Sequence, residues 1–78
     1  MKEQIIKILT DIRPEFDFTQ EGIDFIEEGM LDSFDLITLV SELDKAFGIS
    51  IDGVDILPEN FCSVTAIANL LVKNGVQE

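Results

Sequence analysis

The stretch that decides the fold is residues 25–40, which read FIEEGMLDSFDLITLV. It opens with an acidic, glycine-containing turn and continues with apolar residues at i, i+3, i+4, i+7 and i+11, the spacing of one buried helix face. These apolar residues are Leu36, Leu39, Val40, Leu43 and Phe47. Asp32 or Ser33 can cap such a helix, with Asp35 in its first turn, where the helix dipole favours an acid. The pattern predicts a helix over residues 33–47 whose first hydroxyl lies beside a loop, open to solvent.

The rest of the chain predicts further helices, each with one apolar face. A first helix is expected over residues 2–13, where Pro14 stops it. Gly48 follows the helix described above, as a C-terminal cap residue would. A short helical turn is expected over residues 57–60, and Ser63 is placed to cap a last helix. We therefore expect an all-α fold: a small four-helix bundle of three main helices and one short helix.

A long connection, residues 14–31, joins the first two of these helices. Loops this long in a small domain usually carry function or bring anchors of their own. Its large apolar side chains are expected to be core anchors, because a small domain needs every aromatic residue it has. They are Phe16, Phe18, Ile23, Phe25 and Ile26. With 46% apolar residues, the chain is expected to fold as one domain over residues 1–78.

The charge of the chain is strongly negative, with a net of −11 at pH 7. Such a charge argues against binding to nucleic acid or to anionic membranes, and it favours a monomer. Residues 14–44 contain ten acidic residues and no lysine or arginine. One interpretation of this span is a solubilising surface. Because Ser33 lies inside it, we favour a negative face that steers enzymes with basic surfaces toward the serine.

Composition also limits the chemistry and the location. The chain has no histidine, so neither a Ser-His-Asp nor a Cys-His set can be built. It has no HxxxH, CxxC or glycine-rich phosphate loop, and we expect neither a metal site nor catalytic residues. The single cysteine, Cys62, excludes an internal disulfide, and no apolar run reaches membrane-spanning length. We therefore expect a non-enzymatic protein of the cytoplasm with no membrane insertion.

Residues 29–34, Gly-Met-Leu-Asp-Ser-Phe, and the mostly apolar run 36–40 resemble the attachment site of acyl carrier proteins. The likeness continues to residues 64–68 and so covers most of the chain. In that family the serine of an Asp-Ser-Leu motif carries a 4'-phosphopantetheine arm, whose thiol holds cargo as a thioester. The resemblance implies that Ser33 is the attachment residue. It also implies that Asp32 faces the magnesium site of the transferase that installs the arm.

Two departures indicate which carriers the chain is most similar to. Phe34 stands where leucine is usual, and the spacing from Gly29 to Ser33 is longer than in fatty-acid-synthesis carriers. In this longer spacing the chain resembles D-alanyl and other stand-alone carriers. The implied partners are a phosphopantetheinyl transferase, a ligase that loads an acyl or aminoacyl group, and downstream acyl-transfer enzymes with basic surfaces. A fatty-acid-synthesis carrier is the alternative within the family.

Side chains off the core stripe of the second helix are expected to contact partners. Phe34, Ile37 and Ser41 lie at i, i+3 and i+7, where the resemblance puts partner-recognition residues. The acids expected to act as charge partners are Asp35, Glu42 and Asp44. Thr38 and Lys45 stand where the family has acids on this helix in fatty-acid synthesis. Their presence favours a specialised carrier, for amino acids or a dedicated acyl group.

Two alternatives of other classes remain open from the sequence. The first is a calcium-binding loop of the EF-hand kind, with positions 1, 3, 5, 6 and 12 matched by Asp17, Thr19, Glu21, Gly22 and Glu28. Thr19 and Glu21 replace the usual Asp or Asn, and Asp24 takes position 8, which is normally apolar. The second is a plain helical interaction module, in which Ser33 is only a helix cap and is never modified.

Overall fold

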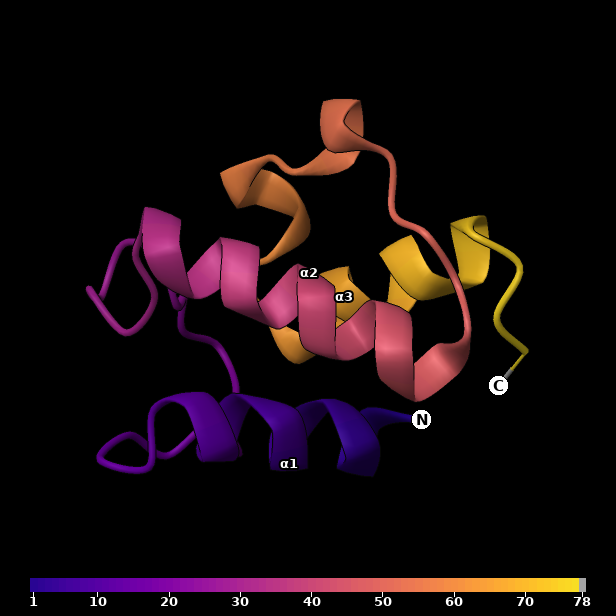
Figure 1. Ribbon diagram of the computed structural model, residues 1–78. Coiled ribbons are helices and arrows are strands. Elements are labelled where there is room, and N and C mark those ends of the chain that lie inside the picture. Colours follow the sequence, from indigo (N-terminus) through magenta and orange to yellow (C-terminus); the bar gives the residue numbers. More distant parts are fainter. Residues whose placement is uncertain (78) are drawn as a thin grey trace.

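The computed structural model describes residues 1–77 and contains three α-helices and two short 3₁₀ turns (Figure 1). In chain order they are α1 (Lys2–Ile12), α2 (Ser33–Phe47), η1 (Gly53–Asp55), η2 (Pro58–Asn60) and α3 (Val64–Lys73). Residues 1–77 contain no β-strand, so the predicted all-α fold is confirmed. The predicted short fourth helix is present as the 3₁₀ turn η2. None of the helices in this range is long and apolar enough to span a bilayer.

The helix boundaries follow local chemistry. α2 occupies the predicted range, and Gly48 ends it with a φ of 64°, a left-handed conformation that glycine adopts without strain. α1 ends at Ile12, one residue earlier than predicted. Arg13 has left the helical conformation, with φ −131° and ψ 78°, because the ring of Pro14 disfavours α geometry in the residue before it.

The start of α2 lies at one end of the bundle. α1 and α2 lie side by side and run in opposite directions, and α3 lies behind α2 in the view of Figure 1. α1 packs against both α2 and α3, and η2 packs against α3. The long connection between α1 and α2 closes the left-hand end of this view. The first turn of α2 is therefore next to the end of α1 and to the long loop.

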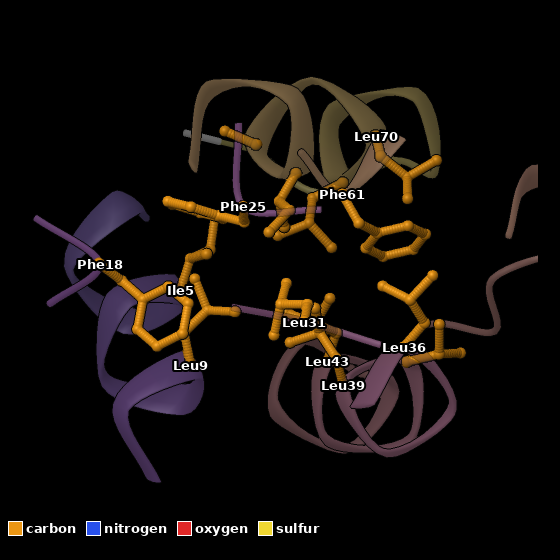
Figure 2. Packing of buried hydrophobic residues seen from close by; sticks show 14 of the residues in the cluster. Ile5, Leu9, Phe18, Phe25, Leu31, Leu36, Leu39, Leu43, Phe61 and Leu70 are labelled. Atoms are coloured by element: carbon orange, nitrogen blue, oxygen red, sulfur yellow. The ribbon is translucent and has the colours of Figure 1, made fainter. Parts of the chain in front are cut away.

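Apolar side chains from all three helices and from the connecting segments fill the interior (Figure 2). The largest fully buried side chains are Phe18, Phe25, Phe61, Ile5, Leu9, Leu39, Leu43, Ile67 and Leu71. Phe18 and Phe25 come from the long loop and meet edge to face, with ring centroids 5.0 Å apart. The prediction that apolar residues anchor this loop is confirmed, although Phe16, Ile23 and Ile26 are only partly buried.

Backbone hydrogen bonds hold the end of the loop directly before α2. The N–H of Phe25 donates to the carbonyl of Cys62 at 2.8 Å, which ties the loop to the segment before α3. The carbonyl of Phe25 accepts the N–H groups of Met30 at 2.9 Å and Leu31 at 3.3 Å. Gly29, between Phe25 and Met30 in the chain, closes the turn with a φ of 73°. Because Met30 and Leu31 are also buried, the residues that lead into α2 are fixed through both backbone and side chains.

Candidate functional site

Ser33 is the first residue of α2, and it is exposed. The helix is capped by Asp32, whose Oδ1 accepts the N–H of Asp35 at 2.9 Å. In return, Asp35 Oδ2 accepts the N–H of Asp32 at 3.0 Å, which completes a reciprocal capping box. The sequence left open whether Asp32 or Ser33 is the cap, and the structure assigns this role to Asp32. The hydroxyl of Ser33 is therefore not required for capping.

Ser63 gives the contrasting case at the start of α3. It is half-buried, and its Oγ accepts the N–H of Ala66 at 3.0 Å, so its hydroxyl is the N-cap of that helix. The prediction that Ser63 caps the last helix is confirmed. The two serines at helix starts therefore differ in chemistry: one hydroxyl is engaged by the backbone, and the other is left available.

Arg13 binds the capping box from the far end of the long loop. Its Nε and Nη2 lie 2.9 and 2.8 Å from Asp35 Oδ2, and Nη2 lies 3.3 Å from Asp32 Oδ2. Its Nη1 pairs with Glu15 Oε2 at 3.3 Å. Sequence reasoning missed this residue, because separations of 19 and 22 positions give no local signal. The acidic span of residues 14–44 therefore contains no basic residue in sequence, but Arg13 lies against its acids in the folded chain.

Asp35 is a buried carboxylate, with 8% of its surface exposed. Burial by itself raises its pKa, but the hydrogen bond and charge of Arg13 and the N–H of Asp32 lower it by more. The pKa of Asp35 therefore lies below its ordinary value of 3.8, and the same contact raises the pKa of Arg13. Both groups are charged at neutral pH. Within residues 1–77, no buried side-chain nitrogen or oxygen lacks a hydrogen-bond partner.

The stability of the fold is expected to fall at acid pH as Asp35 becomes protonated. Because its pKa is lower in the folded chain than in the unfolded one, its contribution is present above the unfolded value of 3.8. The contribution is lost as the pH falls through the lower, folded value. Urea midpoints measured from neutral pH downward should show this contribution of Asp35 down to about pH 4 and its loss below that pH. Asp35→Asn should flatten that acid step, and a step of unchanged size would show that another group causes it.

The predicted partner contacts on α2 divide into free and engaged side chains. Four are exposed: Phe34 (80%), Ile37 (64%), Ser41 and Glu42. Asp44 is half-buried, and its Oδ1 accepts the N–H of Ile51 at 3.0 Å. Asp35 is buried in the capping box. The structure therefore engages these two carboxylates within the fold, and their role as charge partners stays a prediction.

The acids of the long loop serve local turns. Asp17 Oδ1 accepts the N–H and the hydroxyl of Thr19, and these bonds lower the pKa of Asp17. Asp24 Oδ1 accepts the N–H groups of Ile26 and Glu27 at 2.9 and 3.0 Å. In the described part of the chain, no three His, Cys, Asp or Glu residues gather in a way that could hold a metal ion. The EF-hand match therefore has no ligand cluster to support it.

Comparison with known proteins identifies the family. Residues 4–71 match the family described as "Phosphopantetheine attachment site". The chain belongs to this family. It is similar to the D-alanyl carrier protein of Lactococcus lactis subsp. cremoris strain MG1363, with 38% identity over 69 residues that cover 87% of each chain. It is also similar to that of L. lactis subsp. lactis strain IL1403, with 36% identity over the same shares. No solved structure matches the chain at comparable significance.

The protein is thus a phosphopantetheine-bearing carrier of acyl or aminoacyl groups. Its cofactor is 4'-phosphopantetheine, and carriers of this family work with a phosphopantetheinyl transferase and with ligases or acyltransferases. The start of α2 fits the cofactor, since Ser33 is exposed there and its hydroxyl is not the cap of the helix. A phosphate joined to Ser33 would also lie at the positive end of the α2 dipole.

Proposed function

We propose that Oγ of Ser33 carries the 4'-phosphopantetheine arm and that the carrier delivers an amino acid or a small acyl group to partner enzymes. The thiol of the arm, when present, holds this cargo as a thioester. The observation that carries the proposal is the assignment of the α2 cap to Asp32, which leaves the neighbouring exposed residue, Ser33, without a capping role. A serine that served only as a helix cap would make the contact that Ser63 makes.

The residues around Ser33 support attachment of a phosphodiester there. In the attachment step, Ser33 Oγ bonds to the phosphopantetheine phosphorus of coenzyme A, the pyrophosphate bond breaks, and the nucleotide half and the hydroxyl proton leave. The negative charges of Asp32 and Asp35 oppose a further anion at this helix start. Arg13, within 3.3 Å of both, offsets them. The Asp32 side chain is 58% exposed, so its carboxylate stays accessible to a magnesium ion bound by the transferase.

The cargo that we favour is an amino acid, or else a dedicated small acyl group. The relatives at 36% and 38% identity are named D-alanyl carrier proteins, and α2 exposes Thr38 and Lys45 in place of acids. We expect three kinds of partner: a phosphopantetheinyl transferase, an ATP-dependent loading ligase, and a downstream acyl-transfer enzyme, each with a basic contact surface. The carrier contributes no catalytic residue in this scheme. We place it in the cytoplasm, where ATP is available for loading.

Intact-mass spectrometry tests the proposal. The apo protein, incubated with coenzyme A, Mg²⁺ and a phosphopantetheinyl transferase, is expected to gain one arm. The holo protein, incubated with D-alanine, ATP and a D-alanine-activating ligase, is then expected to gain one alanyl group that hydroxylamine removes. Failure to gain the arm contradicts the attachment. In a parallel incubation, gain of the arm followed by loading with a long fatty acid by a fatty-acid-activating ligase and ATP, together with no loading by D-alanine, supports the fatty-acid-synthesis alternative.

Truncation of the exposed apolar pair Phe34 and Ile37 is expected to weaken loading but not the fold. Exposed side chains change stability by about 0.5 kcal/mol or less, whereas apolar anchors at an interface contribute about 1–2 kcal/mol each. Phe34→Ala/Ile37→Ala should therefore lower kcat/KM of the loading ligase by at least about 30-fold. Val72→Ala, at an exposed valine on α3, is the control. Equal loading of both variants and the wild type would show that this face of α2 is not the contact.

A further inference from the structure

Arg13 joins the end of α1 to the start of α2 through the two acids of the capping box. We infer that Arg13 is a positioning residue for the modification of Ser33. It holds Asp32 and Asp35 in the capping box, and this keeps the first turn of α2, with the hydroxyl it displays, in one place for the transferase. The inference rests on the proposed attachment at Ser33.

The contacts of the guanidinium group leave the capping hydrogen bonds intact. Arg13 binds Oδ2 of Asp32, while Oδ1 of the same carboxylate caps the N–H of Asp35. Oδ2 of Asp35 accepts both from Arg13 and from the N–H of Asp32. The ion pairs therefore favour the same side-chain orientations that the capping box needs. A guanidinium can do this because its N–H groups form a rigid planar fork, which a lysine ammonium lacks.

The burial of the contact decides which ion pair matters. Asp35 is buried and most of the Arg13 side chain is covered, so water screens their attraction less than it screens that of an exposed pair. The pair with Glu15 is exposed at the surface, where such pairs contribute little. Arg13 therefore holds the start of α2 mainly through its contact with Asp35, and Asp32 provides a second contact.

Without Arg13, the capping box would set two like charges side by side, one of them buried. An unpartnered buried carboxylate either takes up a proton or turns toward solvent. Either change weakens its acceptance of the N–H of Asp32, and the first turn of α2 becomes free to fray. Ser33 lies between these two acids in the chain. Its hydroxyl would then be presented in many positions, and fewer encounters with the transferase would be productive.

The rate of modification of the apo protein by a phosphopantetheinyl transferase tests the inference, at a temperature where each variant is folded. Arg13→Gln is expected to lower kcat/KM by about tenfold, a ratio within the range that loss of a helix cap causes. Lys7→Gln removes the same charge from an exposed position on α1 and is expected to stay within about twofold of the wild type. This control separates loss of the capping-box contact from loss of net charge.

A double variant separates positioning from direct contact with the transferase. In Arg13→Gln/Asp35→Asn, the amide oxygen at residue 35 still accepts the N–H of Asp32, and no buried charge needs a partner. We expect kcat/KM to recover to within about threefold of the wild type. Hydrogen exchange of the amides at residues 32 and 35 should be faster in Arg13→Gln and slow again in the double variant.

Two results would overturn the positioning role. One is a kcat/KM for Arg13→Gln equal to that of Lys7→Gln. The other is a double variant as slow as Arg13→Gln whose amides at residues 32 and 35 nonetheless exchange as slowly as in the wild type, since the loss of rate would then come from contact with the transferase and not from the position of α2. A wild type that is not modified at all refutes the attachment at Ser33 instead. In that case unchanged amide exchange in Arg13→Gln would still refute the hold of Arg13 on the capping box.

Discussion

The Ser33→Ala variant is expected to take up no 4'-phosphopantetheine and yet to unfold at the same urea concentration as the wild type. The first effect is complete because the oxygen that would bond to phosphorus is gone. The second follows from the structure, since Asp32 caps α2 and the Ser33 hydroxyl is exposed. Alanine is also the best helix former, so stability should change by less than about 0.5 kcal/mol. Intact mass after incubation with coenzyme A and a transferase, and a urea titration, measure the two quantities.

Ser63→Ala is the matched variant, and its expected profile is the reverse. Its hydroxyl caps α3 through the N–H of Ala66, so its loss should destabilise the fold by about 1 kcal/mol. Because Ser63 is not the attachment residue in our proposal, the folded variant should still gain one arm. A Ser33→Ala protein that gains the arm would place the attachment elsewhere. A Ser33→Ala protein as destabilised as Ser63→Ala would show that Ser33 has a structural role after all.

Much of α2 could be predicted from the sequence because its signals are local. The apolar spacing, the glycine that ends the helix and the Asp-Ser pair at its start all lie within about five helical turns of one another. The same is true of Pro14, which ends α1, and of Ser63, which caps α3. In each case the residue acts on backbone groups a few positions away, so its effect does not depend on the rest of the fold.

The roles of Asp32 and Asp35 could not be predicted in the same way. Aspartate and serine cap helices about equally well, so local preference does not choose between Asp32 and Ser33. The structure makes the choice through the reciprocal bond from Asp35. An acid in the first turn is compatible with an exposed partner contact and with a buried ion pair. The structure shows the buried ion pair, because Asp35 binds Arg13, which lies 22 residues earlier. This contact depends on how the long loop folds back.

Phe25→Ala is expected to have the largest effect on stability of the substitutions considered. The Phe25 side chain is fully buried and packs edge-on against Phe18, and truncation of such a residue costs about 3–5 kcal/mol. A domain of this size has on the order of 5 kcal/mol of stability in total. The backbone of Phe25 also holds Met30 and Leu31 ahead of α2. Loss of its side chain should therefore loosen the approach to Ser33 and slow its modification even in molecules that remain folded.

Phe34→Ala is the matched control, because the same atoms are removed from a side chain that is 80% exposed. Its urea midpoint should stay close to that of the wild type, whereas Phe25→Ala should leave little or no folded baseline. Phe25→Leu keeps most of the buried volume and gives a folded variant in which modification can be measured. Equal midpoints for Phe25→Ala and Phe34→Ala would mean that the long loop is not anchored by its aromatic residue. In that case the start of α2 would owe its position to the ion pairs of Arg13 and not to the hydrophobic core.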